Sequence, residues 1–420
     1  MHNLVLKKNY LSILIIVSFI LGFFLNEDVA GGGHHDLPLF YKNFLIIKNN
    51  NFFLIPWNEY VSSGLPLHHL LVANIIFFSE NIFFLKFFSF ILSLFCILIF
   101  YKILKLKYEI HEHFNSSVLL ISVIPLLSPY FRTSGFWGLE ENTCYLFFLI
   151  SAYFFLNKNC NSYNYLAILF SIFTVLIRQS FVFWPLFLFL YYFNFTKIFS
   201  KRNLYIFFSF FIFSLPIFYF IFIFKGFTNE PTRITFTPIN VPIILSFFFI
   251  YLFPFILIHS DKLIRNLTRR QSIVHLVFFL VFYFLFKNQF EIINFYNSIG
   301  GGLIYKFIFN LNIININFNI KVFLFLLISY LGLFFLISIV KKNIFILIFF
   351  LVSLTIYSFV NVIFQEYFDP LIFFIFIIFN NYIKKKNLNK FSIIIFFFYF
   401  LLLMLSFTYR YYIIPRSIIS

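Results

Sequence analysis

The run FLKFFSFILSLFCILIFY, residues 84–101, decides the fold class. It is almost wholly apolar and long enough to cross a bilayer, where a helix satisfies every backbone polar group within its own segment. Similar runs of about 16 to 22 residues recur along the chain, separated by Lys, Arg and Asn. A composition of 62% hydrophobic and 11% charged residues excludes a water-soluble protein of 420 residues. The sequence therefore predicts an all-α, polytopic membrane protein, with one membrane domain over residues 1–420.

The apolar runs predict about 13 transmembrane helices, in a range of 11–13. The expected spans lie near residues 10–25, 84–101, 116–130, 144–156, 164–177, 181–193, 204–224, 241–258, 273–286, 321–340, 344–363, 371–383 and 391–408. The loop between the first two spans, residues 26–83, is far longer than a simple connection between neighbouring helices. Loops of this length are usually functional or unstructured, and we expect this one to carry the active site.

The distribution of charge predicts the orientation of the chain. With a cytoplasmic N-terminus, 19 of the 31 Lys and Arg residues fall in inner loops, but only three of the 14 acids, which are Glu109, Glu112 and Asp261. Excess Lys and Arg mark the cytoplasmic side, so the net charge of +17 is an orientation signal and no nucleic-acid partner is expected. We expect a multi-pass protein of a bacterial inner membrane, in contact with membrane lipids and with its long first loop outside.

The first loop contains the most informative polar run. Gly31-Gly32-Gly33 supplies backbone that can approach a ligand closely, and His34, His35 and Asp36 follow directly. This run is a candidate for a catalytic base; the alternative is a glycine hinge before a helix that begins with Asp36 as its N-cap, ahead of Pro38. Adjacent residues rarely converge on one metal ion without further ligands, so no cofactor is expected and metal dependence stays open. Apolar spacing around residues 37–47 and 65–78 predicts helices lying on the outer membrane surface.

Three further polar clusters fall on the same predicted outer side. SPYFRTSGFWGLEENT, residues 128–143, supplies Arg132, Trp137, Glu140, Glu141 and Asn142, or else forms an interfacial aromatic belt. VLIRQSFVFW, residues 175–184, places Arg178 and Gln179 at the membrane boundary, either as a phosphate site or as a snorkelling anchor. FQEYFDP, residues 364–370, places Asp369 before a proline, where it could also be only a turn residue or a helix cap.

The segment LIRQSFVFW, residues 176–184, resembles the Leu-Arg-Gln-Thr-Asn-Ile-like motif of the dolichyl-phosphoglucose-dependent α-1,2-glucosyltransferases. The plan of many spans with a large, acidic first outer loop is similar to that of the GT-C superfamily of membrane glycosyltransferases. This resemblance implies transfer of a sugar from a polyprenyl-phosphate donor to a glycan or lipid acceptor at the outer face. The first-loop acid stands in a different local context from that of the family, which leaves the base open between Asp36 and the earlier pair Glu27 and Asp28.

The implied chemistry assigns roles to the candidate residues. Asp36 is the expected base for the acceptor hydroxyl, and Arg178, followed by Arg132, is expected to stabilise the departing phosphate. The remaining expected substrate-binding residues are His34, His35, Trp57, Glu59, Tyr60, Glu141, Gln179 and Asp369; alternatively, IPWNEY at 55–60 only anchors the loop. The rival functions are a transporter or flippase for lipid-linked glycans, and a glycan polymerase or ligase. Few charges at mid-span and no internal repeat argue against transport.

Overall fold

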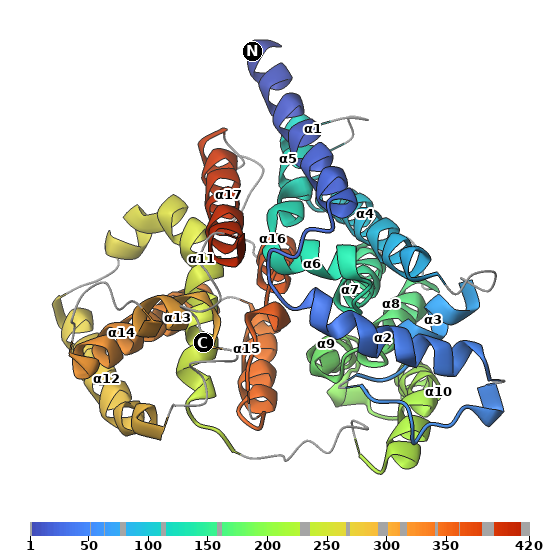
Figure 1. Cartoon of the computed structure of the whole chain (residues 1–420). Helices are drawn as coiled ribbons and strands as arrows, with labels where there is room; N and C mark the ends of the chain where they lie inside the picture. The colour runs from blue at the N-terminus through green and yellow to red at the C-terminus, as the bar shows by residue number, and fades with distance from the viewer. Residues whose placement is uncertain are drawn as a thin grey trace. The chain divides into compact units, whose positions relative to one another are not determined.

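The computed structural model describes most of the chain, and all regular secondary structure in the described residues is helical (Figure 1). The described ranges are 2–50, 52–62, 64–75, 81–110, 115–157, 162–226, 236–265, 269–292, 301–310, 317–340, 343–360, 362–379 and 390–412. The predicted all-α class is therefore confirmed. Some of the charged residues counted for the orientation of the chain lie outside the described residues. They include Glu112 and the inner-loop cations Lys384, Lys385 and Lys386.

The helices group into two compact units. The first unit comprises residues 1–232 and 384–411, and the second comprises residues 233–383 and 412–420. The prediction of a single membrane domain is not tested by this division and stays a prediction. Both units are built from apolar helices and short 3-10 turns, and the candidate residues of the first loop all belong to the first unit.

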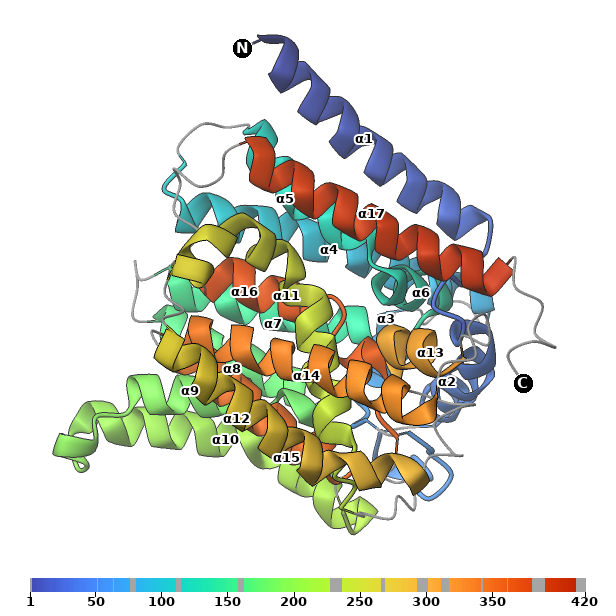
Figure 2. The same ribbon diagram turned by 90° about the vertical axis from the view of Figure 1, so that its left-hand side faces the viewer.

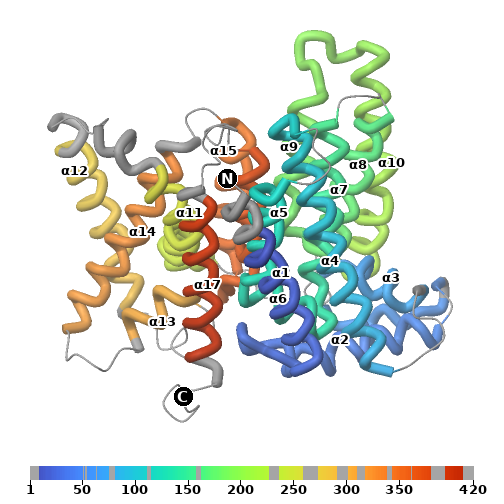
Figure 3. Tube along the Cα trace, turned by 90° about the horizontal axis from the view of Figure 1, so that it is seen from above, coloured from blue at the N-terminus to red at the C-terminus, as the bar shows by residue number. Residues whose placement is uncertain are grey.

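The helices of the first unit are α1 (His2–Phe24), α2 (Gly33–Lys48), η1 (Phe52–Leu54), α3 (Leu67–Ile75), α4 (Ile82–Lys107), α5 (Ser116–Val123), η2 (Ile124–Leu127), α6 (Pro129–Trp137), α7 (Glu141–Leu156), α8 (Ser162–Val175), η3 (Gln179–Val182), α9 (Phe183–Tyr192), η4 (Phe195–Lys197), α10 (Lys201–Phe224) and almost all of α17 (Lys390–Tyr412). Helix α7 packs against both α4 and α8, and Trp184 of α9 is buried beside them, where its Nε1 donates to Ser151 Oγ at 2.7 Å. Helices α2 and α3 lie crosswise at one end of α4, α8 and α10 (Figure 3).

The second unit contains α11 (Asn240–Arg265), α12 (Arg269–Phe286), η5 (Lys287–Ile292), α13 (Gly302–Asn310), α14 (Phe318–Val340), α15 (Ile344–Tyr357), η6 (Gln365–Tyr367) and α16 (Leu371–Phe379). Helix α14 contacts α11 and also α12, beside which it runs (Figure 2). Phe279 of α12 meets Phe323 of α14 edge to face, with ring centroids 5.5 Å apart. Aromatic packing of this kind holds two apolar helices together without any polar contact.

Five described helices are long and apolar enough to cross a membrane, and a bent pair raises the number to six. The five are Ile82–Lys107, Lys201–Phe224, Asn240–Ile258, Ile273–Phe290 and Phe318–Ile337. The bent pair is Ser116–Leu127 with Pro129–Trp137, which meet at 71°. Six further apolar helices are only 10–17 residues long. The described helices are therefore compatible with a membrane-embedded protein but do not support 13 full-length spans.

Two features account for the difference from the predicted span count. Hydropathy registers apolar runs but not where a helix ends, and Ser128 caps a new helix two residues before the end of the expected span 116–130. Predicted span 371–383 is described only as the nine-residue α16, and the rest of that span lies outside the described residues. Helices also form at both predicted surface segments of the first loop, as α2 and α3. Their position on the membrane surface stays a prediction.

Candidate active site

The segment that joins α1 to α2 wraps around the carboxylate of Asp28. Oδ1 of Asp28 accepts the backbone N–H groups of Gly31, Gly32 and Gly33 at 3.2–3.3 Å, and Oδ2 accepts that of His34 at 3.1 Å. Gly31 has φ +73°, a conformation that glycine adopts at little cost. The negative carboxylate thus satisfies N–H groups that no helical carbonyl can reach, and it complements the positive end of the α2 dipole.

Asp36 is not the N-cap of α2, contrary to the alternative interpretation of the sequence. The N-cap is Gly32, which makes no side-chain cap bond, and Asp36 lies in the first turn of the helix. The N-cap role fails because the Asp28 carboxylate, supplied from before the helix, already receives the first N–H groups. The Asp36 side chain is thereby available for another purpose.

Asp36 is exposed, but it shares one side of α2 with buried residues. Residues 36, 43 and 47 recur at helical spacing on one side of α2, and both Asn43 and Ile47 are buried. Part of the Asp36 side chain remains exposed. Partial desolvation by the surrounding protein, with the negative charge of Glu141, raises the pKa of Asp36 to about 6, although Arg178 opposes this effect. Asp36, Glu141 and Arg178 are therefore within electrostatic reach of one another.

Arg178 is held by two consecutive carboxylates at the start of α7. Its Nη2 donates to Glu141 Oε1, and its Nε lies 3.4 Å from Glu140 Oε1. Glu140 is buried, and Glu141 also accepts a hydrogen bond from Ser134 Oγ at 3.1 Å. Arg178 has an extended backbone and lies between the end of α8 and the start of η3. The cluster contains one cation and, with Asp36, three carboxyl groups.

Arg132 makes a different kind of contact. Its Nε and Nη2 form a two-pronged ion pair with Glu27, each N–O distance being 2.6 Å. The other three bonds run from Nη1 and Nη2 to Ser18 Oγ, Ser18 O and Leu126 O, at 3.0–3.3 Å. Arginine has five N–H donors, so this buried side chain has its full complement of partners. Neither Glu27 nor Arg132 presents an unoccupied charge to a substrate.

The two predicted histidines lie beside Asp36 on the exposed first turn of α2. The His34 ring meets Trp137 edge to face, with centroids 5.6 Å apart, and Lys86 Nζ lies 4.1 Å from the Trp137 ring centroid. Lys86 also donates a hydrogen bond to Asn26. The start of α2 is thus placed against aromatic and cationic side chains of α4 and α6.

Trp57 and Tyr60 are buried rather than exposed to a sugar. Trp57 meets Phe220 of α10 edge to face at 5.1 Å, and the Tyr60 ring stacks on Phe224 at 6.0 Å. Tyr60 Oη lies 2.9 Å from Nδ1 of His69. This packing matches the alternative in which the 55–60 segment anchors the loop. Glu59 lies exposed on the same turn.

Two buried histidines of α3 contribute to the region and were not predicted. His68 Nδ1 lies 2.9 Å from Thr143 Oγ1, and its Nε2 lies 3.2 Å from the Gly138 carbonyl. Burial lowers the pKa of His68 to about 4 and that of His69 well below its usual value, so both are neutral near pH 7. The sequence signal was the adjacent pair in LPLHHLL, which resembles an ordinary apolar helix with polar insertions.

The remaining predicted residues are placed as follows. Gln179 begins η3 directly after Arg178 and is partly exposed. Asp369 is buried in the second unit, next to η6, whereas the residues of the Arg178 cluster belong to the first unit. No group of three His, Cys, Asp or Glu side chains suited to a metal ion occurs among the residues described.

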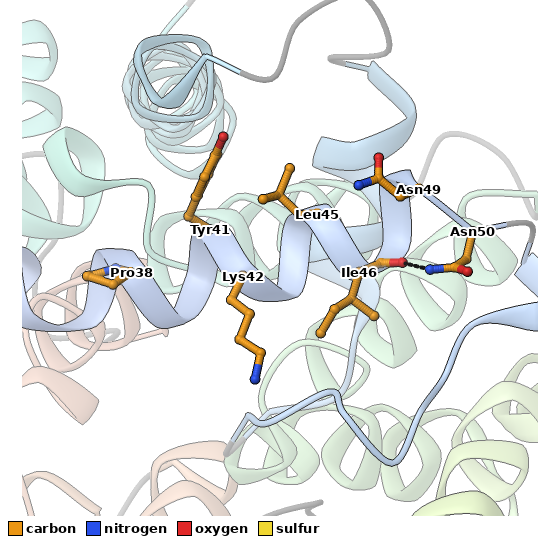
Figure 4. Close-up of a pocket in the computed structure, with 7 residues that line it drawn as sticks. All are labelled: Pro38, Tyr41, Lys42, Leu45, Ile46, Asn49 and Asn50. Carbon is orange, nitrogen blue, oxygen red and sulfur yellow. Dashed lines mark hydrogen bonds between the residues drawn. The ribbon is translucent and has the colours of Figure 1, made fainter.

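A hollow of about 380 Å³ is lined by α2 and the residues that follow it (Figure 4), and helical spacing puts Asp36 on the other side of the helix. Its lining residues follow one another at helical spacing and are Pro38, Tyr41, Lys42, Leu45, Ile46, Asn49 and Asn50. Asn50 Nδ2 donates to the Ile46 carbonyl at 2.7 Å. The hollow is open and contains no carboxylate, so it offers neither a base nor enclosure for a reaction.

The chain matches no known protein family, no curated protein and no solved structure. The likeness to GT-C glycosyltransferases therefore stays a prediction that depends on the quoted residues.

Proposed function

We propose that the protein is a membrane glycosyltransferase that moves a sugar from a polyprenyl-phosphate donor to a lipid-linked or cell-surface acceptor at the non-cytoplasmic face. One observation carries the proposal: Asp36 of the first loop lies within electrostatic reach of Arg178 and Glu141, which come from two other segments. A carboxylate with a pKa near neutrality beside a guanidinium is suited to deprotonate a hydroxyl next to a phosphate. The 13-span topology with a cytoplasmic N-terminus in a bacterial inner membrane belongs to the same proposal.

The proposed reaction balances with these two groups. The acceptor oxygen attacks the anomeric carbon, its proton passes to Asp36, and the bond from the anomeric carbon to the phosphate oxygen breaks. The donor phosphate carries one negative charge as a diester and gains a second as it leaves. Arg178 stabilises that developing charge, and charge stabilisation of this kind is usually the largest single catalytic effect. His34 and His35, on the same turn as Asp36, bind sugar hydroxyls.

The donor phosphate must compete with Glu141 for Arg178. Glu140 is buried behind the guanidinium, whereas Glu141 is the more exposed of the two carboxylates. We therefore assign Glu140 to holding Arg178 and Glu141 to the exchangeable contact. Arg132 has its donors occupied by Glu27, Ser18 and Leu126, so it supports the site instead of binding phosphate.

The proposal is tested by presenting radiolabelled polyprenyl-phosphate sugars and membrane lipid extract to vesicles that contain the purified protein. Movement of label into the acceptor fraction, absent from protein-free vesicles, is the expected result. Label that crosses the bilayer without leaving its donor would replace the transferase with a flippase. Label that moves only as preassembled glycan would replace it with a polymerase or ligase.

Arg178→Ala is expected to raise the donor KM by about 10- to 100-fold, because a hydrogen bond to a charged group contributes about 1.5–3 kcal/mol. Arg178→Lys retains the charge and should lose less. Measuring initial rates over a range of donor concentrations tests this, with circular dichroism as the folding control. An unchanged donor KM in the alanine variant would reduce Arg178 to a membrane anchor.

Activity is expected to fall as the pH drops through about 6, because Asp36 must be ionised to accept a proton. The raised pKa means that protonation begins well above the usual carboxyl range, so the rate at pH 5 should be about tenfold below the plateau. The pH profile of turnover at saturating donor measures this. Full activity at pH 5 would show that the base titrates at its ordinary value or is another group.

A further inference from the structure

The segment before α2 is fastened to α6 as well as to Asp28. Thr133 Oγ1 accepts the Ala30 N–H at 3.1 Å and lies 3.3 Å from Asp28 Oδ1, to which it donates. Trp137 Nε1 donates to the Glu27 carbonyl at 2.9 Å. A side chain at Gly33 would collide with the Trp137 ring, so α2 begins in direct contact with α6. The bonds converge on Asp28, which is 2% exposed.

This arrangement defines where α2 starts. Oδ1 and Oδ2 together receive four consecutive N–H groups, from Gly31 to His34, and Asp36 N–H bonds to the Gly32 carbonyl at 3.0 Å as the helix continues. An α-helix turns by about 100° per residue, since it has 3.6 residues per turn. A slip of the helix start by one residue would therefore rotate Asp36 by about a quarter of a turn, away from Glu141 and Arg178.

We propose that Asp28 is a positioning residue, which sets the rotational position of α2 and thereby directs the Asp36 carboxylate at Glu141 and Arg178. Its importance for turnover rests on the proposed function, in which Asp36 is the base. Asp28 itself is excluded as the base, because its oxygens accept four backbone bonds and one hydroxyl bond and are buried. Gly31–Gly33 and the distant Thr133 then both serve to enclose the Asp28 carboxylate.

The first experiment does not require activity. Carbodiimide with an amine labels protonated carboxyl groups, and mass spectrometry of the labelled protein at a series of pH values gives the titration of Asp36. The wild type should be half-labelled near pH 6. Asp28→Asn retains Oδ1, which receives four of the five bonds, but it removes the charge and puts an amide NH2 in place of Oδ2, the acceptor of the His34 N–H. Asp28→Ala removes all five bonds. The Asp28 charge itself contributes to the raised pKa of Asp36, so the midpoint should fall by a small amount in the asparagine variant and further, toward 3.8, in the alanine variant.

Thr133→Val, which removes the bond from the Ala30 N–H and the bond to Asp28 without changing the charge, should shift the midpoint in the same direction by a smaller amount. Asn50→Ala, at the far end of α2, is the control and should leave it unchanged. Thermal unfolding of each variant identifies any that fail to fold. Equal midpoints in Asp28→Asn and Asp28→Ala would overturn the proposal, since Asp28 would then act on Asp36 only through its charge.

Turnover provides the second measurement. Misplacement of a reacting group by about 1 Å can cost about 100-fold, so Asp28→Ala should lose about that much kcat while the donor KM, set by Arg178, stays the same. A rise in donor KM with kcat unchanged would also overturn the proposal. If the wild type transfers no sugar but the Asp36 midpoint still falls further in Asp28→Ala than in Asp28→Asn, the positioning role stands and the proposed reaction fails.

Discussion

Asp36→Asn is expected to lower turnover by about 100- to 10,000-fold, the usual contribution of a general base. Asparagine has nearly the same shape as aspartate but cannot accept the proton of the acceptor hydroxyl. The position lies in the first turn of α2 and remains partly exposed, so the change should cost little stability. Initial rates of label transfer in vesicles, with the amount of inserted protein matched between variants, measure the effect.

Asp36→Glu is the matched control for the charge. It retains a carboxylate that is displaced along the side chain, so it should lose less than the asparagine variant and keep the acid limb of the pH profile. Retained activity in Asp36→Asn would remove Asp36 as the base. Attention would then pass to Glu141, the other partly accessible carboxylate of the cluster.

Arg132→Met is expected to destabilise the protein by about 3–5 kcal/mol, the usual cost of removing one partner from a buried ion pair. Five hydrogen bonds are lost, and Glu27 is left mostly buried with its negative charge unpaired. The guanidinium also lies over the Phe136 ring, 5.4 Å from the centroid, a contact that methionine replaces only in part. Reversible unfolding in mixed detergent micelles measures the loss.

The double variant Glu27→Gln with Arg132→Met separates the ion pair from simple packing. Removing both charges should recover much of the stability that the single variant loses, because no unpaired charge then remains. A single-variant loss below about 1 kcal/mol would place the pair among solvated surface contacts.

The sequence was sufficient for the fold class but not for the lengths of the helices. Apolar composition predicts most of the described helices, because lipid-compatible backbone must bond within its own segment, but it did not predict α13. It does not show that Ser128 and Pro129 begin a new helix inside an apolar run, since the capping bond from Phe131 N–H to Ser128 Oγ becomes apparent only in the folded chain. The span count was therefore too high for the helices described.

The sequence predicted which charged residues form the candidate site, but it did not predict which of them pair with one another. Asp36, Glu141 and Arg178 stood out as polar residues at helix ends, and the structure brings them close together. Arg132 stood out for the same reason, but its partner Glu27 lies 105 residues away, and one sequence does not show which distant charges meet. Asp28 was named only as an alternative base, and His68 was not selected. The contacts of both residues with backbone N–H and carbonyl groups could not be predicted, because every residue possesses such groups.

The glycine segment also matters for anyone who maps the topology of this protein with inserted tags. Three consecutive glycines resemble a flexible linker, which is the usual choice for an epitope or reporter. In this chain the linker-like composition is misleading, because Gly31–Gly33 donate all three of their N–H groups to one buried carboxylate. A reporter placed there should leave a protein that still enters the membrane but is inactive. The missing signal would then be misread as evidence for a wrong orientation. Asn49 and Asn50, exposed at the end of α2, are the safer position for a reporter in the first loop.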